Sequence, residues 1–189
     1  MPKFIGRKNE LKSLIDLLKL NIAVFIVVRG RRRIGKTRLL EEYSKNFDEV
    51  FIFSGLPPEE NTTNETQLKE FLKQLKRQLP NENFEMGDWG DLFWQLSRYV
   101  QKGRVLIILD EISWMGSKDP DFLGKLKNAW DLYFKNNDQL ALAVSGSASS
   151  WIERNLLHST GFVGRVSLDM ILEEMPLKDC LEFWDDQSH

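Results

Sequence analysis

The 189-residue chain has little of several residue types on which specialised proteins depend. It holds one cysteine, Cys180, and two histidines, so we expect neither an internal disulfide nor a cluster of metal-binding thiols or imidazoles. Its 26 lysines and arginines stand against 28 acidic residues, a net charge of −2, so the whole chain is not basic enough to bind nucleic acid by charge alone. The longest apolar run, residues 22–28, is too short to span a bilayer, and the charged start does not resemble a signal peptide. We therefore expect a cytoplasmic globular protein without a membrane partner.

Apolar runs and helical periodicities alternate along the chain. Runs rich in β-branched residues predict strands at residues 23–28, 49–54, 104–111, 139–147 and 165–172. Apolar residues at helical spacing predict helices over residues 8–20, 36–47, 60–79, 88–101 and 121–135, with another beginning at Leu177. Strands alternating with helices predict a doubly wound α/β fold with its ligand at the carboxyl ends of the strands.

Residues 30–37 read GRRRIGKT and match the pattern G-x-x-x-x-G-K-[ST]. They follow a predicted buried strand and open a predicted helix, which is the setting that this motif requires. Glycines let the backbone wrap around phosphate groups, so that main-chain N–H groups and the helix N-terminus bind the negative charge. We expect Lys36 to reach the β- and γ-phosphates and the Thr37 hydroxyl to ligate Mg²⁺. The alternative, a chance glycine-rich turn, is disfavoured by the strand–loop–helix order.

Two acids follow the third predicted strand. Asp110 and Glu111 end the run LIILDE, and the carboxyl end of that strand should emerge beside the first strand. Asp110 could then hold the water shell of the metal, while Glu111 could orient or deprotonate an attacking water. The alternative is an acidic turn that caps the next helix.

Serines and arginines near these elements have two interpretations each. Ser145 and Ser147 end the fourth predicted strand; one could contact the water or the γ-phosphate, or residues 147–150 could cap a helix containing Trp151. Residues 31–33 should point away from phosphate and form a solvated basic face. The alternative is a nuclear-localisation or nucleic-acid patch, for which three basic residues are fewer than is usual. Arg165, before the last strand, could stabilise charge on a transferred phosphoryl group, in its own or a neighbouring subunit, or form an ion pair.

With the segments FIGRKNEL, GRRRIGKTRLL, LIILDEISWM, VSGSASSWI and GRVSLDMILEEMPL placed in this order, the chain resembles the archaeal-type ATPases of the AAA+/STAND group. The resemblance covers residues 4–184. It implies a three-layer α/β/α P-loop NTPase core of the ASCE type, with a parallel five-stranded sheet in the order 5-1-4-3-2. It also implies ATP rather than GTP, because the chain has no Asn-Lys-x-Asp motif for reading guanine.

The resemblance also assigns residues by function. It implies Mg²⁺ ligation by Thr37 and Asp110, and catalytic roles for Lys36, Glu111 and Arg165, with Ser145 or Ser147 as the sensor. Those implied to bind the nucleotide are Ile5, Gly6 and Arg7 beside the adenine, and Gly30, Arg31, Arg32, Arg33, Ile34, Gly35, Lys36, Thr37 and Arg38 around the phosphates. Arg7 could instead form an ion pair at a helix N-terminus.

We expect residues 1–176 to form the ATPase core and residues 177–189 to begin a C-terminal helical lid that is cut short. The first functional hypothesis is Mg²⁺-dependent ATP hydrolysis that drives a conformational switch on a protein or DNA partner, slow here because no lid completes the site. The second is a nucleotide-gated scaffold that binds ATP or ADP and signals with little hydrolysis. A P-loop kinase of a small metabolite is a weaker third. The resemblance is compatible with a homo-oligomer.

Overall fold

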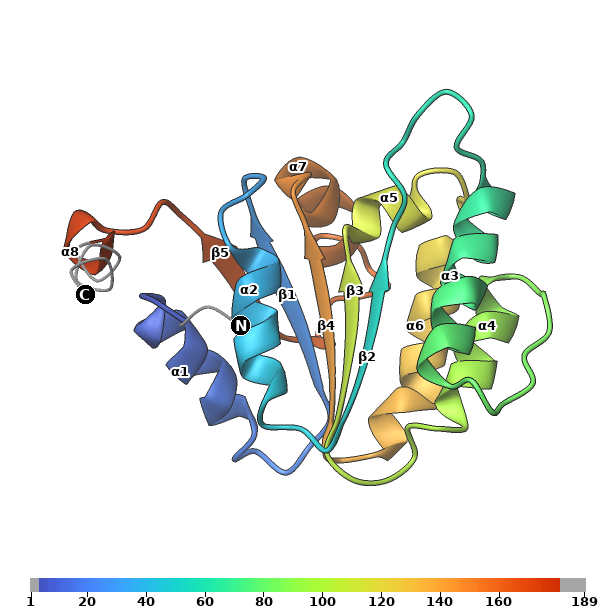
Figure 1. Cartoon of the computed structure of the whole chain (residues 1–189), viewed down its shortest axis with the longest axis horizontal. Coiled ribbons are helices and arrows are strands. Elements are labelled where there is room, and N and C mark those ends of the chain that lie inside the picture. The colour runs from blue at the N-terminus through green and yellow to red at the C-terminus, as the bar shows by residue number, and fades with distance from the viewer. Residues whose placement is uncertain (1–3, 181–189) are drawn as a thin grey trace.

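Five parallel strands form one sheet in the order β2-β3-β4-β1-β5, which Figure 1 shows nearly edge-on. The strands are β1 (Val24–Gly30), β2 (Glu49–Ser54), β3 (Val105–Asp110), β4 (Leu140–Gly146) and β5 (Val166–Leu172). This order confirms the predicted 5-1-4-3-2, read from the opposite edge. The three central strands are buried almost throughout, whereas the edge strands β2 and β5 alternate between buried and exposed residues. Burial on both faces explains why the central strands are continuously apolar in sequence.

Helices cover both faces of the sheet in this computed structural model, which describes residues 4–180 (Figure 1). On one face lie α1 (Lys8–Leu17) and α2 (Lys36–Ser44), and on the other lie α3 (Asn64–Gln78), α4 (Trp89–Ser97) and α6 (Phe122–Leu132). The core on the α3 side is rich in aromatic rings: Phe53 stacks on Phe71 with 4.1 Å between ring centroids, and Trp89 meets Phe122 edge to face at 4.8 Å. Such contacts stabilise the layer beyond the area they bury.

Several predicted helices are shorter in the structure. Helix α1 ends at Leu17 instead of residue 20, because the next residues form a turn in which the amide of Leu18 bonds the carbonyl of Ile15 at 3.0 Å. Helix α3 begins one residue after Thr63, which forms a reciprocal capping box with Thr66. Short elements that periodicity did not indicate are α5 (Ile112–Gly116), η1 (Phe134–Asn136) and η2 (Glu153–Leu157). They contain too few turns to give a periodic signal.

The parallel sheet gathers the carboxyl ends of its strands at one edge. Arg29 of β1 pairs with Gly146 of β4, and Leu109 of β3 pairs with Val144, so the segments that follow these strands emerge together. Two short helices, α5 and α7 (Ser149–Ile152), lie at this end, at the top of Figure 1. The helix predicted at Leu177 is α8 (Leu177–Cys180); residues 181–189 of the predicted lid lie outside the described residues. Between residues 4 and 180, no helix has the length and apolarity to span a membrane.

Candidate functional site

The segment 30–37, here called the phosphate loop, connects β1 to the first turn of α2. Two glycines permit its path. Gly30 has φ 152°, and a Cβ atom there would lie 2.5 Å from the carbonyl oxygen of Leu172 in β5. Gly35 has φ 99°, which L-residues rarely adopt, and α2 begins at the next residue, Lys36. The loop therefore passes close to neighbouring backbone and ends at a helix N-terminus, where main-chain N–H groups favour an anion.

Lys36 is folded into the loop. Its side chain is 5% exposed, and its Nζ donates to the carbonyl oxygens of Gly30 and Arg31, each at 2.9 Å. Burial lowers the pKa of Lys36, while the nearby carboxylates of Glu111 and Asp110 act in the opposite direction. The ammonium thus lies inside the turn that is predicted to surround phosphates, held by carbonyl groups that an anionic ligand could replace.

The two predicted metal ligands face each other. The Thr37 hydroxyl donates to Oδ2 of Asp110 at 2.9 Å, and Oδ1 of Asp110 accepts a short hydrogen bond from the fully buried hydroxyl of Ser145. One hydroxyl and one carboxylate suit Mg²⁺, which keeps several waters and takes its remaining ligands from phosphates. Within the described residues, no group of three or more His, Cys, Asp or Glu side chains could hold a metal ion alone. The donor set therefore fits a magnesium ion that arrives with a nucleotide.

Glu111 has an unusual backbone and a defined partner. It has φ 52°, in the left-handed region that non-glycine residues rarely enter. Its Oε2 accepts the backbone N–H of Ser147 at 3.0 Å and the Ser147 hydroxyl at 2.9 Å. Strained backbone of this kind gathers at functional sites, where surrounding contacts hold it in place. Here the end of β4 holds the carboxylate that follows β3.

The two serines have different positions. Ser145 lies behind Asp110, where it orients that carboxylate. The alternative that residues 147–150 cap a helix is wrong: α7 begins after Ala148 without a side-chain capping bond among the described residues, and the hydroxyl of Ser147 is bonded to Glu111. Ala148, rather than Ser147, occupies the N-cap position of α7.

The arginines at 31–33 are exposed, and two of them contact groups outside the phosphate loop. Arg31 pairs with Glu174 at 3.1 Å, both side chains being about 80% exposed. Arg32 lies over the ring of Trp114 in α5, 4.9 Å from its centroid. The exposed pair with Glu174 adds little stability, whereas the stacked guanidinium joins the loop to the helix that follows Glu111.

A hollow of about 460 Å³ lies beside the phosphate loop. Three segments line it, with Phe4, Ile5, Arg7, Ile34, Gly35, Arg38, Met175 and Cys180 among the lining residues. Arg7, 6% exposed, donates to Glu10 at 2.9 Å and to the carbonyl oxygens of Ile34 and Glu173. The ion pair at the start of α1 is thus confirmed, while the place of Arg7 beside an adenine stays a prediction. A backbone turn at Gly6, with φ 67°, packs against Met175.

Arg165 does not reach this site in its own chain. Val166 pairs with Phe25 and Leu172 with Gly30, so at about 3.3 Å per residue β5 separates Arg165 from the phosphate loop by roughly 20 Å. Instead, Arg165 donates two hydrogen bonds to the carboxylate of Asp131 in α6, at 2.9 and 2.8 Å. The prediction that it could act in cis is wrong, because it precedes β5 and so lies at the amino end of the parallel sheet. Action in a neighbouring subunit stays a prediction.

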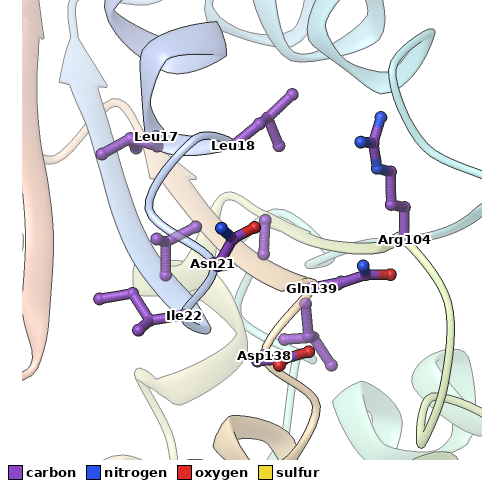
Figure 2. Close-up of a pocket in the computed structure, with 10 residues that line it drawn as sticks. Leu17, Leu18, Asn21, Ile22, Arg104, Asp138 and Gln139 are labelled. Atoms are coloured by element: carbon purple, nitrogen blue, oxygen red, sulfur yellow. The ribbon is translucent and has the colours of Figure 1, made fainter.

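A second hollow, shown in Figure 2, also lies at the amino ends of the strands. Its labelled residues include Leu17, Ile22 and Arg104, and its volume is about 30 Å³. A space of that size holds one or two water molecules. It is too small and too distant to belong to the site at the phosphate loop.

Sequence reasoning missed some residues of the site. Met175 and Cys180 line the hollow but lie about 140 residues beyond the phosphate loop, and Trp114 receives Arg32 from a helix of five residues. Local periodicity carries no signal for any of them, because each contact joins distant segments. Phe4 belongs to a segment already singled out, FIGR, and stacks against Arg38 at 5.7 Å.

Comparisons with known proteins point to one family. A family model described as an ATPase domain predominantly from Archaea matches residues 4–189. The uncharacterized protein MJECL04 of Methanocaldococcus jannaschii is 26% identical over 181 residues, which cover 96% of this chain and 38% of that protein.

Solved structures share the fold. The Walker-type ATPase PABY2304 of Pyrococcus abyssi superposes with a TM-score of 0.67 at 15% identity, covering 97% of this chain and 57% of that one. The ORC2 protein of Aeropyrum pernix in its ADP form superposes with a TM-score of 0.65 at 15% identity, covering 98% of this chain and 53% of that one. The chain thus has the fold of P-loop ATPases, and it spans little more than half of each of these structures.

Proposed function

The chain belongs to the family of ATPase domains found predominantly in Archaea, and from this membership we propose that it binds ATP together with Mg²⁺ and hydrolyses it. The observation that carries the proposal is the contact between Thr37 and Asp110, 2.9 Å apart, beside the buried Lys36. A hydroxyl from the phosphate loop and a carboxylate from β3 face each other where a nucleotide-bound metal would be ligated.

Each residue has a role that follows from its position. Lys36 exchanges the carbonyls of Gly30 and Arg31 for phosphate oxygens, and the main-chain amides of the loop bind the remaining negative charge. Thr37 and Asp110 hold the metal, which neutralises developing charge on the phosphates when it is bound. Glu111 orients and deprotonates the attacking water. The hollow lined by Phe4, Ile5 and Arg7 accommodates the adenine.

The output of hydrolysis is a change of conformation that acts on a protein or DNA partner. The chain spans 38% of MJECL04. The segments that would contact such a partner could therefore lie in the part of the longer relatives that this chain does not cover. The ORC2 structure carries ADP by its description, which supports nucleotide binding by a protein of related fold.

A second candidate function is a nucleotide-gated scaffold with little hydrolysis. One observation favours it: both hydrogen-bond donors of Ser147 occupy Oε2 of Glu111, with distances of 3.0 and 2.9 Å. While that arrangement persists, the carboxylate is engaged and less available to activate water. Nucleotide binding and hydrolysis must therefore be measured separately.

A thermal-shift titration tests nucleotide binding. We expect ATP and ADP with Mg²⁺ to raise the melting temperature and GTP to raise it less. At a ligand concentration about 100 times Kd, binding stabilises the native state by about 2.7 kcal/mol, and each kcal/mol raises Tm by about 2–4 °C in a domain of this size. Lys36→Ala should abolish the nucleotide-induced shift.

The matched control is Lys45→Ala, because Lys45 is an exposed residue at the end of α2, paired with Glu42 at 2.8 Å and remote from the loop. It should retain the full shift. An unshifted wild-type protein, or an equal shift in the Lys36→Ala variant, would contradict the proposed nucleotide site.

A further inference from the structure

Strand β2 forms one edge of the sheet, and its outward backbone groups require partners. Phe51, Phe53 and Gly55 face β3, as the bond from the Gly55 amide to the Asp110 carbonyl at 3.1 Å illustrates. Because alternate residues of a strand present their N–H and C=O groups to opposite sides, Ile52 and Ser54 present theirs outward. Unpaired, such groups form a template for pairing with another strand.

The side chains of three glutamines in α3 form hydrogen bonds with outward-facing backbone groups of β2 and of Leu56, just after it. Gln78 accepts the N–H of Ile52 at 2.7 Å and donates to its C=O at 2.9 Å, and Gln74 does the same for Ser54 at 2.8 and 3.0 Å. Gln67 repeats the pattern one step farther, accepting from the N–H and donating to the C=O of Leu56, both at 2.9 Å. Each side-chain amide thus makes the pair of bonds that a peptide group of a neighbouring strand would make.

The spacing of helix and strand makes the match possible. Gln74 and Gln78 are one helical turn apart, a rise of about 6 Å, and Ile52 and Ser54 are two strand residues apart, about 6.6 Å. Figure 1 shows α3 beside β2 at that edge of the sheet. Gln67 is 2% exposed and also donates to the carbonyl of Trp114 at 3.1 Å. Its side-chain amide therefore bonds both the backbone of α5 and the segment that follows β2.

The covered strand would readily pair with itself. Its sequence, EVFIFS, is rich in β-branched and aromatic residues and has no proline or glycine, the composition of segments that associate as strands. Ile52 is 41% exposed. Two identical edges can pair antiparallel about a two-fold axis, because that interface is self-complementary.

We propose that Gln67, Gln74 and Gln78 form a substitute strand that closes the β2 edge against pairing with β2 of a second copy of this chain. This inference does not rest on the nucleotide site. It concerns only this edge, so assembly through other surfaces is unaffected.

The test removes the two outer amides while keeping a good helix former. We expect Gln74→Ala combined with Gln78→Ala to double the molecular mass relative to wild type in a concentration-dependent manner, measured by size exclusion with light scattering. The control is Lys73→Ala with Arg77→Ala, two exposed positions of the same helix, and it should keep the wild-type mass. Adding Ile52→Lys to the glutamine variant should restore the wild-type mass, because facing lysines on paired edges repel.

Hydrogen exchange of the wild-type protein gives an independent readout that needs no variant to fold. The amides of Ile52 and Ser54 should exchange at least about tenfold more slowly than freely solvated amides, because each is bonded to a glutamine. The proposal is overturned if these amides exchange freely, or if the folded glutamine variant keeps the wild-type mass. It is equally overturned if the control variant associates to the same extent or Ile52→Lys leaves the association unchanged.

Discussion

At the scale of single residues, the candidate site depends on two acids held by two serines. Ser145 orients Asp110, and Ser147 bonds Glu111, whose backbone lies at φ 52°. A glycine would adopt that φ without strain, so the presence of glutamate there points to a need for the carboxylate. The strain is compensated by two hydrogen bonds from the neighbouring strand end.

Glu111→Gln separates binding from hydrolysis. The amide oxygen can still accept from Ser147, so the fold and ATP affinity should be unchanged, but the general base is lost, which lowers the hydrolysis rate by about 10²–10⁴-fold. Phosphate release and nucleotide-induced thermal shift measure the two properties side by side. Glu65→Gln is the control, an exposed acid of α3 that pairs with Lys69 and lies outside the phosphate loop and the hollow. Equal hydrolysis by wild type and Glu111→Gln would favour the scaffold function.

At the scale of elements, capping decides where helices begin. Asp88 precedes α4 and accepts the N–H of Asp91 at 3.0 Å, while Asp91 accepts the N–H of Asp88 at 3.0 Å. Asp121 occupies the same position before α6 without a side-chain capping bond in the described part of the chain. The two aspartates share residue type and helix position but differ in the capping bond, and Asp88 also pairs with Lys125 at 3.3 Å.

Asp88→Ala should reduce the free energy of unfolding by about 1 kcal/mol, because it leaves an amide of the first helical turn without its acceptor. Asp121→Ala should change it by less than about 0.5 kcal/mol. Urea denaturation of both variants measures the difference. If the two substitutions lower the free energy of unfolding equally, the capping box at α4 contributes nothing specific to stability.

At the scale of the whole molecule, Arg165 joins the last strand to the layer of helices. Its guanidinium bonds both carboxylate oxygens of Asp131, which also contacts Lys127 at 3.1 Å and Lys135 at 3.6 Å. Hydrogen bonding from Arg165 holds the pKa of the Asp131 carboxyl well below its usual range. This cluster at the amino end of the sheet connects α6 to β5 at the end opposite the phosphate loop.

Asp131→Asn should lower Tm at pH 7, and the loss should depend on pH. A carboxyl group whose folded pKa is lowered stabilises the fold fully above its unfolded pKa, about 3.9, and loses that contribution as pH falls through the folded value. The Tm difference between wild type and variant should thus be constant from about pH 6 to 8 and shrink below about pH 4. A difference that is independent of pH down to the acid transition would argue against the ion pair as its source.

Local patterns in the sequence predict the order of the elements, the parallel sheet and the residues at the centre of the candidate site. The phosphate loop lies within eight consecutive residues, and the central strands are apolar because both of their faces are buried. Such local patterns need no knowledge of distant contacts. The carboxyl ends of parallel strands meet at one edge, so Asp110 could be placed near Thr37 before any coordinates were known.

Contacts between distant segments became visible with the packing of the layers. This packing places Arg165 against Asp131 at the amino end of the sheet and Ser147 within hydrogen-bond distance of Glu111. It also places Met175 at the hollow beside the phosphate loop and the glutamines of α3 along the β2 edge. In each case the partner is 11 or more residues away, and hydropathy periodicity records which face is buried, not which residue lies opposite. Those pairings follow from how the layers pack, which is a property of the whole chain.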